Sequence, residues 1–225
     1  MTKYLKLFTN YYKTDSYESG TDYIEPYVSL TESIGGGGVN YNLVPSIILT
    51  MNDSSKIKLY KIINISLNSL NFEKKNIPYN NVAKMELSNK ITSIIDLMFC
   101  RNIKSINIPN SVTSISSNAF NFLSNLTSIS IPSSIKSIEK ETFSSCQNLS
   151  SVTLTDSITS IDKTAFKNDL YIHELKIIGK KNISNLLPHE LTDKLTNLYV
   201  DSSLIETYKT FRNSIGKTFE VKPLN

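Results

Sequence analysis

The chain has 225 residues, with 24 Lys or Arg against 20 Asp or Glu, which gives a formal net charge of +4 at pH 7. This mild charge is spread along the sequence, so it forms neither a nucleic-acid footprint nor a membrane-binding patch. No apolar run approaches the roughly 20 residues of a membrane span. The two cysteines give no disulfide framework. We therefore expect no nucleic-acid partner and no membrane insertion.

Residues 1–45 form the first predicted region, which is rich in tyrosine and contains a glycine run at 35–38. Tyrosine is favoured at protein interfaces that stay partly exposed to water, so one interpretation is an anchoring or oligomerisation region. The other is that these rings pack on the first coil of the domain that follows. The interface candidates are Tyr4, Phe8, Tyr11, Tyr12, Tyr17, Tyr23 and Tyr27. Through this interface we expect the chain to form a homo-oligomer, either a dimer or a trimer.

Residues 46–225 form the second predicted region. Its initial strands, at 46–81, are rich in β-branched residues that alternate imperfectly with polar ones. A short first coil begins near Val82, because Met85 and Leu87 match Ile106 and Ile108 with a shift of 21 residues. Terminal repeats of a solenoid are usually atypical, which explains a coil two residues short.

Residues 103–200 repeat an apolar triplet every 23 positions. The five triplets are Ile103, Ile106 and Ile108; Leu126, Ile129 and Ile131; Leu149, Val152 and Leu154; Ile172, Leu175 and Ile177; and Leu195, Leu198 and Val200. A constant period in the twenties indicates a solenoid, in which each unit buries its apolar face only by stacking on its neighbours. We therefore predict a mainly β fold with short helices, with coils at 82–200.

Polar residues alternate with the apolar ones inside each triplet, so we expect them to point away from the core on one strand face. This exposed strand face is a candidate surface for a protein or a glycan, or it is simply solvated. Its residues are Ser105, Asn107, Ser128, Ser130, Ser151, Thr153, Glu174, Lys176, Asn197 and Tyr199.

A second apolar set follows the triplet in three copies. Its spacing fits a short second strand and then a helical or 3₁₀ turn that carries Phe120, Phe143 or Phe166. The pattern in residues 126–166 resembles the BspA-like class of leucine-rich repeats, and across the repeats Pro109, Ala119, Phe120 and Cys146 fall where that class places those residue types. The resemblance implies a surface or adhesive protein without enzymatic activity.

The chain ends in a predicted cap at 201–225. Ser203 and Glu206 have the spacing of a capping box, and an apolar face at helical spacing predicts an amphipathic helix over 202–214. Residues 217–224 then return as a last edge strand. Before the cap, Pro188 is placed to start a short helix.

Few residues point to chemistry. His173 and His189 have no neighbours in the sequence that would complete a metal or nucleophilic site. Cys100 and Cys146 are expected to fill the core as small apolar residues. Gly216, Lys217 and Thr218 lack the earlier glycine of a phosphate loop. We predict no catalytic, metal or cofactor residue, and no enzyme.

The first ten residues lack the apolar core of a secretory signal peptide, so we expect assembly without export. The segment from Tyr4 to Asn42 also resembles N-terminal segments of virion proteins from phages of gut Bacteroidales. That resemblance implies a virion component such as a capsid-decorating, head-fibre or tail-attached protein, which contacts capsid or tail components. The alternative is a secreted or cell-surface bacterial adhesin.

Overall fold

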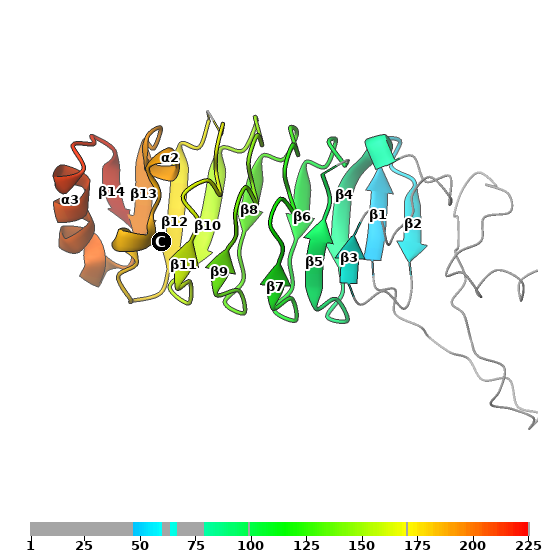
Figure 1. Ribbon diagram of the computed structural model, residues 1–225, viewed down its shortest axis with the longest axis horizontal. Coiled ribbons are helices and arrows are strands. Elements are labelled where there is room, and N and C mark those ends of the chain that lie inside the picture. The colour runs from blue at the N-terminus through cyan, green and yellow to red at the C-terminus, as the bar shows by residue number, and fades with distance from the viewer. Residues whose placement is uncertain (1–46, 60–63, 67–78, 99, 170, 225) are drawn as a thin grey trace, which may run out of the picture.

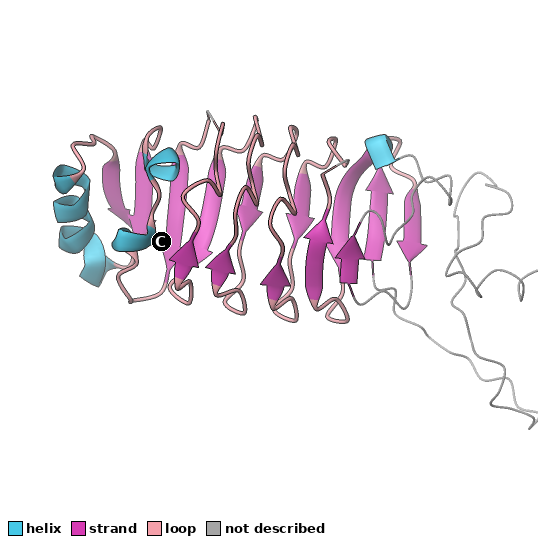
Figure 2. Cartoon of the chain, viewed as in Figure 1, coloured by secondary structure: helices cyan, strands magenta, loops and turns pink. Residues whose placement is uncertain are grey.

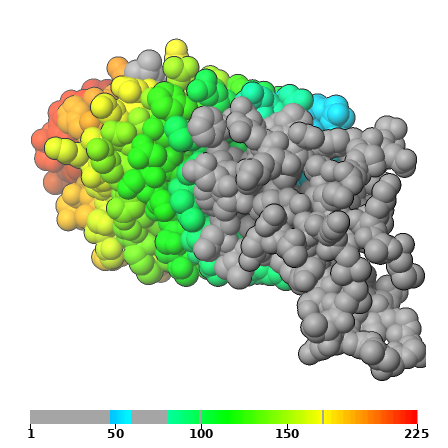
Figure 3. All heavy atoms as spheres, turned by 45° about the vertical axis from the view of Figure 1, so that its right-hand side comes forward, coloured from blue at the N-terminus to red at the C-terminus, as the bar shows by residue number. Residues whose placement is uncertain are grey.

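The computed structural model describes residues 47–59, 64–66, 79–98, 100–169 and 171–224. The Tyr-rich interface candidates, Phe8 and the glycine run lie outside these residues. The described part is mostly β with a few short helices, arranged as coils that follow one another along a rod (Figures 1 and 2). In the space-filling view the colours succeed one another in bands from the C-terminal end, so consecutive coils are neighbours in space (Figure 3).

Two walls of strands run along this rod. The first wall contains β1 (Ile47–Met51), β2 (Lys56–Leu59), β4 (Val82–Leu87), β6 (Ser105–Asn107), β8 (Ser128–Ser130), β10 (Ser151–Thr155), β12 (Glu174–Ile178), β13 (Asn197–Val200) and β14 (Glu220–Pro223). The second wall contains β3 (Asn64–Ser66), β5 (Ser93–Asp96), β7 (Ser114–Ile115), β9 (Ser137–Ile138) and β11 (Ser160–Ile161).

Neighbouring strands from β4 onward run parallel. In the first wall Val152 is the partner of both Ile129 and Leu175, Leu175 is the partner of Leu198, and Met85 is the partner of Ile106. All of these side chains are buried. The apolar positions of successive triplets therefore stack as rungs of one interior, as the spacing predicted.

The strands before β4 have a different arrangement. β1 pairs antiparallel with both β2 and β4, so the first wall begins with a hairpin. β3 pairs in parallel with β5, which extends the second wall ahead of the first full coil. The predicted strands in 46–81 are thus present where the structure describes that segment.

Columns of hydroxyl groups reinforce the stacking of the coils. Thr127 Oγ1 donates to the carbonyl of Lys104 at 3.3 Å, and Ser150 Oγ donates in turn to the carbonyl of Thr127 at 3.1 Å. Ser134 and Ser157 form a second column to Val112 and Ile135. Carbonyl groups of one coil therefore accept hydrogen bonds from side chains of the next coil.

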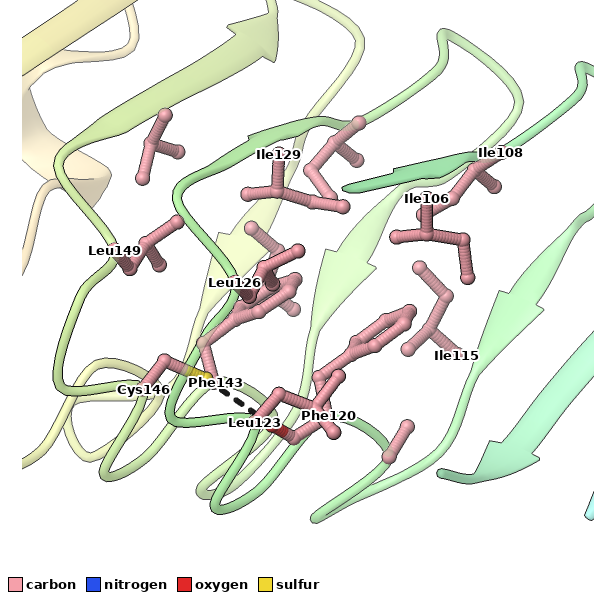
Figure 4. Packing of buried hydrophobic residues seen from close by; sticks show 14 of the residues in the cluster. Ile106, Ile108, Ile115, Phe120, Leu123, Leu126, Ile129, Phe143, Cys146 and Leu149 are labelled. Atoms are coloured by element: carbon pink, nitrogen blue, oxygen red, sulfur yellow. Dashed lines mark hydrogen bonds between the residues drawn. The ribbon is translucent and has the colours of Figure 1, made fainter. Parts of the chain in front are cut away.

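The phenylalanine column forms the centre of the core. The rings of Phe120 and Phe143 are 5.1 Å apart and those of Phe143 and Phe166 5.3 Å apart, with interplanar angles of 3° and 12°. Figure 4 shows Phe120 and Phe143 inside the coil, among the aliphatic side chains of the walls. All three rings are fully buried.

The segments that carry these rings are single turns with i→i+3 hydrogen bonds, such as that from Ala119 N–H to the carbonyl of Ser116 at 3.1 Å, so the predicted 3₁₀ turn is present but does not extend into a helix. The reason is backbone conformation: Asn118 and Phe122 have φ angles of 61° and 60°, and Glu141 and Ser145 have 53° and 62°. Left-handed residues cannot continue a right-handed helix. They turn the chain back toward the first wall within a few residues.

The C-terminal end is covered by helix α3 (Ile205–Ser214), which follows the 3₁₀ turn η4 (Ser202–Leu204), as Figure 1 shows. Two more short helices, η3 (Ser184–Leu186) and α2 (His189–Thr192), connect β12 to β13, and the 3₁₀ turn η2 (Tyr79–Asn81) precedes β4. Helix α2 starts directly after Pro188, as predicted. Tyr208 of α3 is fully buried, and its hydroxyl accepts a hydrogen bond from Ile183 N–H at 3.0 Å.

The capping box predicted at Ser203 and Glu206 is wrong. Asp201 caps this end instead, because its Oδ1 accepts hydrogen bonds from the backbone N–H and the hydroxyl of Ser203 at 2.9 and 2.6 Å. The helical segment begins with the 3₁₀ turn η4, which moves the cap two residues earlier. Glu206 forms an ion pair with Lys209 at 2.7 Å.

Candidate contact face

The outward side of the first wall holds two straight rows of side chains. In the first outward row, strand pairing places Lys84 beside Ser105, and it aligns Ser128, Ser151, Glu174, Asn197 and Glu220 with one another. In the second outward row it places Glu86 beside Asn107, and it aligns Ser130, Thr153, Lys176, Tyr199 and Lys222. Together we call the two rows the outward face. All ten strand-face residues predicted from the sequence lie in it.

The two rows continue across the boundary between β6 and β8. These strands lie side by side in Figure 1, and the backbone N–H of Thr127 donates to the carbonyl of Lys104 at 3.3 Å just ahead of them. The outward face therefore runs over seven consecutive strands, from β4 to β14.

The middle of the outward face is small and uncharged. Ser105, Asn107, Ser128 and Ser130 are exposed. Ser151 and Thr153 on β10 are half-buried. Short side chains leave the backbone of a sheet accessible to a flat partner, and they lose little rotamer entropy when a contact orders them.

Ion pairs mark both ends of the outward face. Lys84 Nζ lies 2.8 Å from Glu86 Oε1 on β4, Lys176 Nζ lies 3.1 Å from Glu174 Oε1 on β12, and Lys222 Nζ lies 2.7 Å from Glu220 Oε2 on β14. Sequence reasoning missed four of these residues. An offset of 23 residues from Leu198 reaches Val221 on β14, and the offset of 21 residues between Met85 and Ile106 reaches β4. The repeat spacing could therefore have identified these four residues.

Hydrogen bonds keep these carboxylates ionised. The bond from Lys84 holds the pKa of Glu86 below its usual value, and the bonds from Lys176 and then Ser151 do the same for the pKa of Glu174. The bond from Lys222 lowers the pKa of Glu220, while Glu220 raises the pKa of Lys222. The carboxylates of Glu86, Glu174 and Glu220 therefore carry charge at neutral pH.

Tyr199 is the one aromatic side chain in these two rows. Lys176 Nζ lies 5.6 Å from the centre of its ring, within the range of a cation–π contact. On the neighbouring strand, Lys222 Nζ donates to Asn197 Oδ1 at 2.7 Å. The side chains of β12, β13 and β14 are therefore held in place by one another.

The residues considered for chemistry are engaged in structural contacts. Cys100 and Cys146 are free thiols in the core; burial raises the pKa of Cys100 to about 12 and also raises that of Cys146. His173 Nδ1 lies 3.2 Å from the carbonyl of Lys194. His189 does have an acidic partner, contrary to expectation, since its Nδ1 lies 2.6 Å from Asp193 Oδ1.

Lys217 Nζ also contacts Asp193 Oδ1, at 2.8 Å, so this carboxylate joins α2 to the loop after α3. Among the described residues, no three or more His, Cys, Asp or Glu side chains gather in a way that could hold a metal ion. No helix in the described ranges is long and apolar enough to cross a membrane.

Two solved structures resemble this chain at low similarity. One is a leucine rich cell surface protein from Faecalibacterium prausnitzii A2-165, with 16% identity, a TM-score of 0.26, and coverage of 69% of this chain and 62% of that one. The other is a leucine-rich repeat protein from Bacteroides ovatus ATCC 8483, with 13% identity, a TM-score of 0.35, and coverage of 93% and 65%. The match spans less than two thirds of either protein.

No curated protein matches the chain. A family model does: the BspA type leucine rich repeat region matches residues 71–187 in six copies. That range is more than half of the 225 residues. It includes the phenylalanine column and the outward face from β4 to β12. The chain therefore belongs to the family of BspA type leucine rich repeat proteins.

Proposed function

We propose that this protein is a non-enzymatic contact protein, structural or adhesive, that uses the outward face to bind a macromolecular partner, a protein or a glycan. The observation that carries the proposal is the register of the two outward rows over seven strands. A face fixed by backbone pairing is organised before binding, so little entropy is lost in ordering it.

The surroundings of the cysteine and histidine side chains support a role without catalysis. A cysteine nucleophile acts as the thiolate, and burial opposes that form at Cys100 and Cys146. His173 and His189 are exposed, and their Nδ1 atoms are paired with a backbone carbonyl and with Asp193. These contacts hold the two imidazole rings as part of the fold.

Two observations favour two different settings for this contact role. The resemblance of residues 1–45 to virion segments supports a capsid-decorating, head-fibre or tail-attached protein. Membership of the BspA type family supports display on a bacterial cell surface. Mass spectrometry of purified particles and protease treatment of intact cells separate the two, because only a displayed protein is cleaved on cells and only a virion protein co-purifies with particles.

The contact role is tested by placing bulky charge on the outward face. The face variant is N107R/T153R, with one substitution on β6 and one on β10. Its matched control is S114R/S160R, two exposed serines on β7 and β11 of the second wall, likewise separated by one strand. The purified full chain is applied to immobilised wild-type chain, to a glycan array and, on beads, to bacterial cells. We expect the face variant to lose binding at least about tenfold while the control binds like the wild type. Equal binding by both variants would refute the role of this face.

A further inference from the structure

The signs of the charges on the outward face reverse from one end to the other. The first outward row begins with Lys84 and ends with Glu174 and Glu220. The second begins with Glu86 and ends with Lys176 and Lys222. Between the charged strands β4 and β12, both rows carry only serine, threonine and asparagine. The face therefore has one charge pattern at β4 and the opposite pattern at β12 and β14.

This reversal makes the outward face complementary to itself. A two-fold rotation about an axis that lies along β10 brings two copies face to face with their rods antiparallel. It sets β4 against the partner's β14, β6 against the partner's β13 and β8 against the partner's β12. Each row then faces the same row of the other copy. Lys84 meets the partner's Glu220, and Glu86 meets the partner's Lys222.

The charged residues at both ends are accessible for such pairing. The side chains of Lys84 and Glu86 are 49% and 39% exposed, and those of Lys222 and Glu220 are 40% and 68% exposed. Their intrastrand ion pairs contribute little in solvent. Exchanging them for contacts across an interface therefore costs little.

The size of the outward face predicts a weak complex. Seven strands spaced by about 4.8 Å span about 29 Å, and strands of three to six residues are about 10–20 Å long. Such a face buries about 300–600 Å² on each partner, or about 600–1,200 Å² in all, which is at or below the lower limit for a specific interface. Charge complementarity at this size mainly sets orientation and association rate.

We propose that the partner of the outward face is a second copy of this chain, paired antiparallel around a two-fold axis at β10. The inference rests on the contact role proposed above and names the partner for it. The centre of the pair is the small, uncharged part of β8, β10 and β12, where Ser151 and Thr153 meet their own copies. The ends are held in register by opposite charges.

Two charge-swap variants of the full chain test this pairing. The first is K84E/E86K on β4. The second is E174K/K176E/E220K/K222E on β12 and β14. Each swap exchanges both members of an intrastrand ion pair, so the pair within the strand and the net charge are kept. Like charges then face each other in a dimer of either variant.

Sedimentation velocity over micromolar to sub-millimolar concentrations gives the readout. We expect the wild type to form a reversible dimer that salt weakens, because exposed charges are screened. Either variant alone should associate at least about tenfold more weakly. Their equimolar mixture should regain wild-type association, because the swapped β4 end fits the swapped β12–β14 end and the two unaltered ends fit each other.

Three outcomes would overturn the pairing. They are a wild type that stays monomeric, swap variants that associate as well as the wild type, and a mixture that does not recover. The second outcome would assign association to another surface, such as residues 1–45. A monomer that still binds glycans through the outward face would reject the pairing but leave the contact role intact. Binding unaffected by N107R/T153R would instead reject the contact role.

Discussion

Asp169 Oδ1 accepts a hydrogen bond from the backbone N–H of Cys146 at 2.7 Å, which joins two coils 23 residues apart in the sequence. The side chain is 5% exposed, and within the described residues its Oδ2 has no hydrogen-bond partner. Burial raises the pKa of Asp169 from 3.8 to about 8, against the opposing effect of the Cys146 bond. The core thus contains an acid that is neutral in the folded state over most of the acidic range.

Asp169 should make the protein less stable as the pH rises. Its folded pKa lies above its unfolded value, so its contribution is fully present below about pH 4 and is lost as the pH rises to about 8. One pKa unit corresponds to about 1.4 kcal/mol, so the loss is on the order of a few kcal/mol. Asp169→Asn keeps an acceptor for Cys146 but carries no charge.

Urea unfolding at several pH values measures this effect. We expect Asp169→Asn to match the wild type near pH 4 and to be more stable than the wild type near pH 9. If the stability of the wild type depends on pH in the same way as that of the variant, the carboxyl group of Asp169 is not the source of that dependence.

Phe143 should be the most sensitive position of the phenylalanine column, because it is stacked on both sides, against Phe120 and Phe166. Phe143→Ala leaves a cavity between two rings and should cost about 3–5 kcal/mol in the free energy of unfolding. Tyr171→Ala is the matched control, since Tyr171 is 53% exposed and should change the stability by less than about 0.5 kcal/mol. Similar midpoints of urea unfolding for the two variants would contradict a continuous aromatic core.

Phe122 should be replaceable with a gain in stability. Its φ is 60°, a left-handed conformation that bulky residues disfavour, and its side chain is 46% exposed. Asn168 has φ 64° at the equivalent turn two coils later. Phe122→Asn should therefore stabilise the fold by about 0.5–1 kcal/mol, while Phe122→Leu should not, because leucine disfavours the same conformation. A less stable Asn variant would show that the ring makes a contact worth more than the strain.

Tyr208 should hold the C-terminal cap on the last coils through one hydrogen bond. Tyr208→Phe leaves the Ile183 N–H buried without its acceptor, at a cost of about 1–3 kcal/mol. Hydrogen exchange should show faster exchange of the Ile183 amide in this variant, with no change in Tyr171→Phe as control. Unchanged protection of Ile183 would mean that water or another group replaces the hydroxyl.

The stacked interior could be predicted because its signal is local and repeated. Ile129, Val152 and Leu175 alternate with polar neighbours, and alternation fixes which side of a strand is buried. The constant offset then fixes which residues pair, since each coil must lie on the one before it. The outward positions of Ser130 and Thr153 follow from the same two facts.

The turns and the cap could not be predicted in the same way. Glu141 and Phe122 adopt left-handed conformations that their residue types do not favour, so only the packing of the coil reveals them. Asp201 and Ser203 both have side chains suited to capping, and the choice depends on the 3₁₀ start of the helix. The charge reversal between Lys84 and Glu220 needs the full register, including a last strand that follows a helix.

Copies of this chain should meet at the outward face. Thr153→Cys tests it directly, because this residue lies at the proposed axis and the native thiols of Cys100 and Cys146 are buried. Ser160→Cys, exposed on the second wall, is the control. With a short bismaleimide, we predict rapid formation of a covalent dimer by Thr153→Cys and little by Ser160→Cys. Equal rates for the two variants, or no dimer from Thr153→Cys, would contradict the claim.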